Sequence, residues 1–209
     1  LSEDIHGPRH PLTQALRRHI AAVQVDQGQL READAELRRL HAMTLESLGP
    51  RHRDTASSWN SMGIIAWERG DNAAAVRDVA QAVAIWRENE SMQILPGGLF
   101  NYGMVLHSAG RHDEALAALE ESRRMRVATI GASHALIGET DRMIGEVLAA
   151  KGDLEGATTR FDRAVRLTRV GFGPDHPRTW FAQLSMARQL TRLHRPQARP
   201  PTSACRPGR

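Results

Sequence analysis

Apolar residues recur at helical spacing over most of the chain, and polar segments separate the periodic stretches. Apolar positions three and four residues apart place a hydrophobic stripe on one face of an α-helix. No proline before residue 195 interrupts one of these stretches, as expected for a residue that breaks helices. The pattern predicts helices over residues 12–27, 30–47, 54–69, 72–88, 97–109, 112–128, 134–151, 154–170 and 177–193.

The predicted helices form pairs, and the pairs repeat along the chain. A glycine separates the two helices of each pair, and these glycines are 42, 40 and 42 residues apart: Gly28, Gly70, Gly110 and Gly152. Small residues precede each glycine by seven positions and alanines follow it by five: Ala21, Gly63, Gly103 and Gly145, then Ala33, Ala75, Ala115 and Ala157. Small residues let two helices approach closely, and glycine adopts turn conformations that other residues avoid. Each repeat is therefore a helix A, a tight turn, a helix B and a loop.

The loops that follow helices B share a second marker. It is present in close or degraded copies: Gly7-Pro8-Arg9-His10-Pro11, Gly49-Pro50-Arg51-His52, Gly131-Ala132-Ser133-His134 and Gly173-Pro174-Asp175-His176-Pro177. The third repeat is two residues shorter and lacks the marker, so we expect an irregularity at residues 91–98, with Pro96 before the helix. We also expect Asp54, Ser133 and Asp153 to cap the helices that follow them, because short polar side chains favour that position.

Together these residues resemble the tetratricopeptide repeat, in the roughly 42-residue form found in kinesin light chains, and the resemblance covers about residues 7–193. It implies an all-α fold, a right-handed α-solenoid of antiparallel helix pairs. The domain would span residues 1–194. Its repeats would lie at about 7–48, 49–90, 91–130 and 131–172, before a terminal helix at 173–193.

The ends of the chain carry two further expectations. Residues 1–6 resemble the close of a preceding helix B, so we expect an upstream repeat and a longer parent protein, of bacterial origin. Residues 195–209 are rich in proline and arginine and lack apolar periodicity, so we expect this tail to be disordered.

Composition and charge narrow the class of function. Aromatic residues make up only 4% of the chain, so the core must consist mainly of aliphatic residues, and strand-favouring residues are scarce. The net charge is +4, but the tail alone holds four arginines and no acidic residue, so residues 1–194 are neutral. A neutral array argues against nucleic-acid binding. No apolar run is long enough to span a bilayer, and we expect a cytoplasmic protein that does not enter the membrane.

Candidate catalytic and metal-binding motifs are weak. His52-Arg53-Asp54 resembles the start of a kinase catalytic loop, but Trp59 stands where that loop requires asparagine. His6 and His10 have the spacing of helical zinc ligands, yet Gly7 and Pro8 lie between them. The only cysteine, Cys205, lies in the tail. The sequence therefore predicts no enzyme, no metal and no cofactor.

The family resemblance also implies a binding surface, because helices A line the concave groove of a tetratricopeptide superhelix. The repeat spacing places an apolar floor with several arginines and amides there, formed by Arg18, Ala22, Val25, Asn60, Ile64, Trp67, Phe100, Asn101, Met104, His107, Arg142, Glu146, Leu184 and Arg188. Such a surface suits a peptide with an apolar anchor and acidic neighbours. The alternative is that some of these side chains only pack against adjacent helices.

The predicted function is that of a protein–protein interaction scaffold that binds a peptide or partner protein in the groove. The lysine and asparagine set with which some members of the family grip a peptide C-terminus is not present, so we do not predict chaperone binding. The alternative function is a regulatory or sensory region of a larger signalling protein, such as a bacterial Ser/Thr kinase or a transcriptional regulator. The sequence leaves the oligomeric state open.

Overall fold

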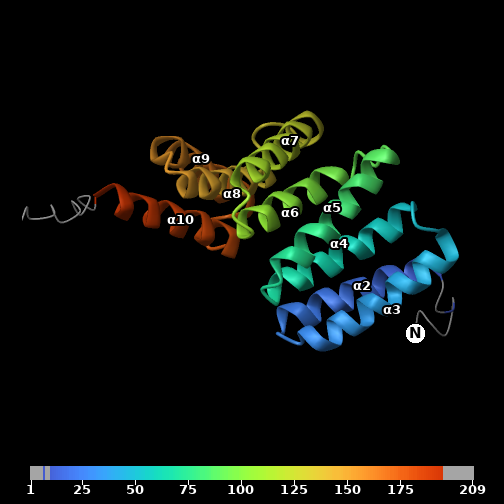
Figure 1. The fold of residues 1–209 in the computed structure, drawn as a ribbon. Coiled ribbons are helices and arrows are strands. Elements are labelled where there is room, and N and C mark those ends of the chain that lie inside the picture. The colour runs from blue at the N-terminus through green and yellow to red at the C-terminus, as the bar shows by residue number, and fades with distance from the viewer. Residues whose placement is uncertain (1–6, 8–9, 195–209) are drawn as a thin grey trace, which may run out of the picture.

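The computed structural model describes residues 7 and 10–194, and within them the chain consists of helices joined by short turns and loops (Figure 1). The helices are α2 (Pro11–Asp26), α3 (Leu30–Leu48), α4 (Arg53–Glu68), α5 (Asn72–Glu88), α6 (Leu95–Ser108), α7 (His112–Ile130), α8 (Ala135–Lys151), α9 (Leu154–Phe172) and α10 (Pro177–His194). Their bounds lie within two residues of the predicted ones. The expectations for residues 1–6 and 195–209 fall outside the described residues.

The helices pack as successive antiparallel pairs, α2 with α3, α4 with α5, α6 with α7 and α8 with α9. Each later helix A also contacts the helix B before it, and neighbouring helices A contact one another. As a result α2 and α10 lie at opposite ends of an elongated array (Figure 1). The predicted all-α solenoid is therefore confirmed.

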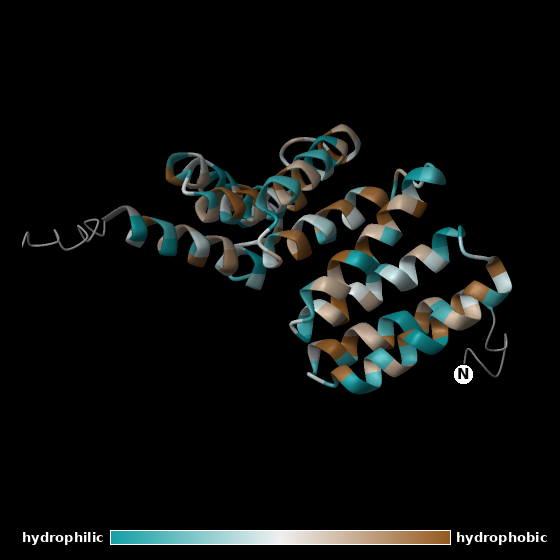
Figure 2. Cartoon of the chain, viewed as in Figure 1, coloured by the Kyte–Doolittle hydropathy of each residue, from teal (hydrophilic) through white to brown (hydrophobic). Residues whose placement is uncertain are grey.

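Both hydrophobic and polar residues occur along each helix (Figure 2). The buried apolar side chains form clusters between helices. A large core cluster connects α4 through α8, and a second joins α2, α3 and α4. The predicted turn glycines at 28, 70, 110 and 152 all have positive φ, between +75° and +87°. These turns let helix B fold back on helix A without the steric cost that a side chain would bring.

A small residue lies where helix A and helix B of one pair cross. A Cβ atom added to Gly103 would lie 2.5 Å from Cγ of Leu119, and one added to Gly63 would lie 2.5 Å from Cγ2 of Val79. The equivalent Ala21 is fully buried. The close helix contact therefore depends on the missing side chain.

We expect Gly103→Ala to lower the free energy of unfolding by about 1–3 kcal/mol, because the new methyl group overpacks the contact with Leu119. The matched control is Gly97→Ala in the same helix, where a Cβ would meet nothing within 4 Å. This control should raise stability by about 0.5–1 kcal/mol through helix propensity. Urea denaturation measures both changes. Equal effects of the two substitutions would contradict the close-contact role of Gly103.

The histidines of the interhelical loops cap the helices A. The backbone N–H two residues later donates to Nδ1 of each histidine, at 3.3 Å for His10, 3.1 Å for His52, 3.1 Å for His134 and 3.2 Å for His176. An imidazole accepts at Nδ1 in the tautomer that carries its proton on Nε2.

The expectation that Asp54 and Ser133 cap these helices was wrong. His52 stands at the N-cap with extended backbone angles, whereas Asp54 already lies in the first turn of α4. His134 likewise is the N-cap of α8, one residue after Ser133. Asp153 does cap α9, and its Oδ1 accepts from the N–H of Gly156 at 2.9 Å, as predicted.

We expect His134→Ala to lower the free energy of unfolding by about 1 kcal/mol, the usual result of removing a capping acceptor. His134→Asn should restore most of that loss, because its side-chain oxygen reaches the same N–H. Urea denaturation at neutral pH compares the two variants with the wild type. If asparagine were as harmful as alanine, the imidazole would be acting through some contact other than the cap.

The predicted irregularity in the third repeat is a turn at residues 89–94. Glu90 there has φ +49°, which is positive for a residue other than glycine. Helix α6 begins at Leu95, so Pro96 lies in its first turn rather than before it, where the missing proline N–H breaks no helical hydrogen bond. Ile94 at the N-cap makes no side-chain bond, because the capping histidine is absent from this loop.

Candidate functional site

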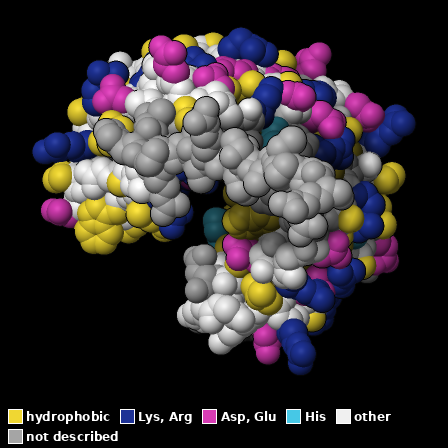
Figure 3. Space-filling model, turned by 60° about the vertical axis from the view of Figure 1, so that its left-hand side comes forward, with side chains coloured by type: hydrophobic (Ala, Val, Ile, Leu, Met, Phe, Trp, Pro, Cys, Tyr) yellow, Lys and Arg dark blue, Asp and Glu magenta, His cyan; other side chains and the backbone are white. Residues whose placement is uncertain are grey.

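Helices A carry most of the side chains predicted for the groove, and two cavities lie along them. One, of about 270 Å³, lies mainly between α2 and α4. Five predicted residues line it: Arg18, Ala22, Val25, Asn60 and Ile64. The other, of about 260 Å³, lies among α6, α8, α9 and α10 and is lined by the predicted His107, Glu146 and Arg188. In Figure 3 the described surface curves around a central hollow with hydrophobic, acidic and histidine side chains at its margin.

Arg18 is the charged group of the first cavity. Burial lowers the pKa of its guanidinium, and nearby Asp54 partly offsets this effect. Its Nη1 is buried and has no hydrogen-bond partner among the described residues. A buried guanidinium N–H without an acceptor is costly, so the cavity offers a donor to an anionic or carbonyl oxygen.

The second cavity combines polar groups from three helices. Glu146 accepts hydrogen bonds from Nη1 of Arg142 at 2.5 Å and from Oγ of Ser185 at 2.8 Å. Gln189 is buried, and its Nε2 donates to the carbonyl oxygen of Leu154 at 3.1 Å. Its Oε1 has no partner among the described residues. Because Arg142 neutralises Glu146, the exposed Arg188 gives this cavity a positive edge.

Between the two cavities, neighbouring helices A bond to each other. Nδ2 of Asn101 donates to Oδ1 of Asn60 at 3.1 Å, and Nε1 of Trp67 donates to Oγ of Ser108 at 2.7 Å. These pairs hold α4 against α6. Asn101 and Trp67 therefore have structural partners as well as their predicted places on helices A.

The remaining predicted side chains pack against the core to different extents. Phe100 lies beneath the guanidinium of Arg126, whose carbon is 5.1 Å from the ring centroid. Met104 is half-buried against the main core cluster, and Leu184 is exposed.

Sequence reasoning missed Ser185, Gln189 and Arg192, which line the second cavity with the predicted Arg188. Residues three and four apart share a helix face, so Ser185 and Arg192 could have been found by stepping from Arg188. Gln189 is the immediate neighbour of Arg188, and no periodic signal distinguishes it.

The pKa of His107 in the groove is lowered. Burial lowers its pKa, adjacent His112 lowers it further, and Glu146 raises it. The two histidines lie side by side, with their Nδ1 atoms 3.2 Å apart. The folded state therefore favours the neutral form of His107.

We expect the free energy of unfolding to fall as the pH drops below the ordinary histidine range near pH 6.5, because the unfolded chain takes up a proton that folded His107 resists. His107→Gln removes this difference, so its stability should fall less between about pH 7.5 and about pH 5.5. Urea denaturation at both pH values measures the change, with His19→Gln on α2 as the exposed control. If the free energy of unfolding of His107→Gln fell between the two pH values as much as that of the wild type, His107 would not be the source of the pH dependence.

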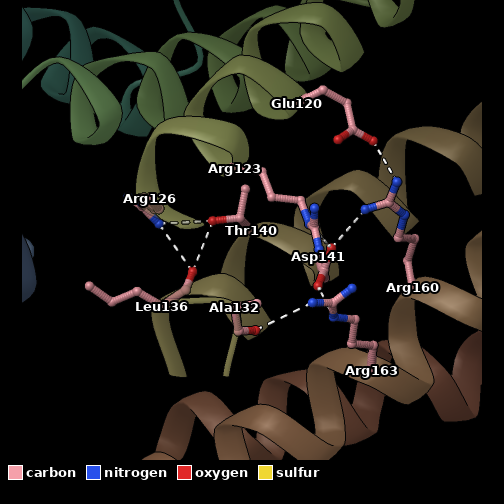
Figure 4. A network of polar contacts seen from close by, with 9 residues as sticks. All are labelled: Glu120, Arg123, Arg126, Ala132, Leu136, Thr140, Asp141, Arg160 and Arg163. Carbon is pink, nitrogen blue, oxygen red and sulfur yellow. Dashed lines mark hydrogen bonds and ion pairs between the residues drawn. The ribbon is translucent and has the colours of Figure 1, made fainter. Parts of the chain in front are cut away.

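A polar network outside the groove joins α7, α8 and α9 (Figure 4). Asp141 is fully buried, and three arginines contact its carboxylate: Arg123 at 2.8 Å, Arg160 at 2.8 Å and Arg163 at 3.1 Å. Arg160 also pairs with Glu120 at 2.6 Å. Three ion pairs thus offset the buried charge of Asp141, and the network holds the third helix pair against the fourth.

Metal-ligand clusters and membrane-spanning helices are both absent from the described part of the chain. No three His, Cys, Asp or Glu side chains gather there as metal ligands would. No helix in that part combines the length and the apolar character that crossing a membrane requires.

Comparison with known proteins gives consistent results. A model of the tetratricopeptide repeat matches residues 12–88, and a second model of this repeat matches residues 101–136 and 142–178. No curated protein matches the chain.

Several solved structures share the fold. Nearly identical TPR-like repeats assigned to a Podosopora anserina kinesin light chain have a TM-score of 0.72 at 19% identity, over 87% of each chain. BtubC (BKLC) from P. vanneervenii gives 0.66 at 19% identity, over 79% of this chain and 66% of its own. The apo form of RapI gives 0.65 at 12% identity, over 86% of this chain and 48% of its own.

Proposed function

Because the chain belongs to the tetratricopeptide repeat family, in its kinesin-light-chain-like form, and is a protein-interaction scaffold, we propose that helices A bind an acidic segment of a partner protein. The observation that carries the proposal is Arg18, whose buried Nη1 has no partner among the described residues and lies beside an apolar cavity. A carboxylate from a partner would supply the missing acceptor.

The side chains around Arg18 suit a short peptide. Val25 and Ile64 offer apolar contact next to the guanidinium, and Asn60 offers an amide for a peptide backbone. An apolar side chain would enter beside Ile64, with an acidic neighbour directed at Arg18. Peptides that dock by this arrangement gain orientation from a few polar contacts and affinity from the apolar anchor.

The second cavity extends the same chemistry along the array. Arg188 and Arg192 are exposed at its edge, and Arg142 already neutralises Glu146. The groove therefore has positive groups at both cavities, although the array as a whole carries no net charge. This distribution favours an acidic partner and determines which face of the neutral array it meets.

The test uses a displayed library of random peptides selected on the intact chain. We expect enriched peptides to hold an apolar residue close to an acidic one. Replacing Arg18, Asn60, Arg142 and Arg188 together by alanine should weaken their binding by at least about tenfold, because several charge-assisted contacts are lost. Fluorescence anisotropy measures the dissociation constants.

The matched control replaces four exposed residues that do not line either cavity by alanine: Arg31, Arg39, Gln81 and Arg124. It should bind the enriched peptides as the wild type does. Circular dichroism verifies that both variants remain helical. Full-strength binding by the folded groove variant would mean that the peptides dock elsewhere.

A further inference from the structure

The polar cluster around Asp141 has an altered counterpart between the first two helix pairs. Four of its members are Glu120, Arg123, Asp141 and Arg160. The equivalent positions, 82 residues earlier in each case, hold Arg38, His41, Trp59 and Asp78. Glu120 and Arg160 thus correspond to residues of opposite charge, Arg38 and Asp78. The carboxylate of Asp141 is replaced by the indole of Trp59.

Because of this exchange, no ion pair joins Arg38 to Asp78 across the first junction, which is the contact between the first and second helix pairs. Arg38 pairs with Asp34 on its own helix at 3.0 Å, and Asp78 pairs with the adjacent Arg77 at 2.9 Å. In the junction between the third and fourth helix pairs, Glu120 and Arg160 instead pair with each other at 2.6 Å. A cavity of about 540 Å³ therefore remains between α3, α4 and α5.

The floor of this cavity is aromatic. His41 lies against Trp59, with ring centroids 4.3 Å apart, and its Nδ1 is 2.8 Å from Oγ of Ser58. Burial lowers the pKa of His41, while Asp78 raises it, so the position equivalent to the Arg123 guanidinium carries a neutral ring. A cation over the face of a tryptophan is attracted by the ring quadrupole.

Asp78 has fewer charged partners than Asp141. Its residue is only 4% exposed, and the ion pair that the structure shows is with Arg77, whose side chain is 71% exposed. Asp141, by contrast, is surrounded by three arginines. A buried carboxylate needs close partners to offset its lost hydration, and a surface arginine supplies little of that.

We propose that this cavity receives the guanidinium group of an arginine from a partner polypeptide, with Asp78 as its carboxylate and Trp59 as its aromatic contact. The chain itself shows that this architecture accommodates guanidinium groups, since Arg123 and Arg160 hold the equivalent positions in the other junction. Exposed Arg69 and Asp71 flank the cavity, where Arg69 pairs with Asp34 at 3.3 Å and Asp71 caps α5 by accepting from the N–H of Ala74. None of the residues lining the groove cavities lines this one, so it is independent of the proposed peptide groove.

The experiment follows the indole N–H signals of the intact chain in two-dimensional ¹H–¹⁵N spectra, with Trp59→Phe assigning the relevant signal. The probe is acetyl-Gly-Arg-Gly-amide, and the same peptide with citrulline replacing arginine is its neutral isostere. We expect a saturable shift of the Trp59 signal with the arginine peptide and at least about tenfold weaker binding of the citrulline peptide. No saturable shift, or equal binding of the two peptides, would overturn the proposal.

Two variants test the geometry. Asp78→Asn should weaken binding by about tenfold or more, whereas Asp175→Asn in an exposed loop should not change it. His41→Arg places a guanidinium of the chain itself in the cavity, so it should abolish probe binding without lowering the melting temperature. Undiminished binding by the folded forms of both Asp78→Asn and His41→Arg would refute the assignment.

Two further binding measurements distinguish this proposal from other ways in which the probe could bind. Methylguanidinium should bind more weakly than the peptide, and equal affinity would overturn the role of a polypeptide. The groove variant with alanine at Arg18, Asn60, Arg142 and Arg188 should bind the arginine peptide normally. Loss of binding in that variant would show that the probe occupies the groove rather than the junction.

Discussion

The close contact between the two helices of each pair determines the geometry of the rest of the array. Gly63, Gly103 and Gly145 bring helix A so near to helix B that a single methyl group would collide with Val79, Leu119 or Phe161. Once this contact is fixed, one side of helix A faces its own helix B. Its other sides must meet the preceding helix B and the neighbouring helices A. The groove and the junctions between pairs are therefore consequences of one packing contact.

Most of the fold could be predicted from the sequence, because its determinants are local or periodic. The turn glycines adopt positive φ, and the spacing of small residues identified the helix crossings. The capping residues were harder to predict, since general preferences favour Asp54 and Ser133 over histidine. The histidines cap the helices because His52 and His134 lie one position before the first helical residue. Their extended backbone angles bring Nδ1 to the free N–H.

The candidate site was predictable only in part. Periodicity assigned residues such as Arg18 and Ile64 to helices A, but it carries no information about contacts between helices. Asn60 and Asn101 are 41 residues apart and meet only because α4 packs against α6. The buried donor of Arg18 likewise follows from its surroundings and not from its place in the repeat. Periodicity thus selects the face, and tertiary packing decides which groups on that face are left without partners.

The three junctions between helix pairs show how far equivalent positions can differ in chemistry. Between the second and third pairs these positions are apolar, and three of them, Val83, Leu99 and Ala118, are buried. Between the third and fourth they form the ion cluster around Asp141. Buried ion clusters and well-packed apolar contacts often have similar net stability, so a solenoid tolerates either at any one junction. The requirement is that each junction satisfies its own charges. The first junction differs around Asp78, which is buried and has one ion pair, to the exposed Arg77, whereas three arginines contact Asp141. The proposed guanidinium group of a partner would add a second cation beside Asp78.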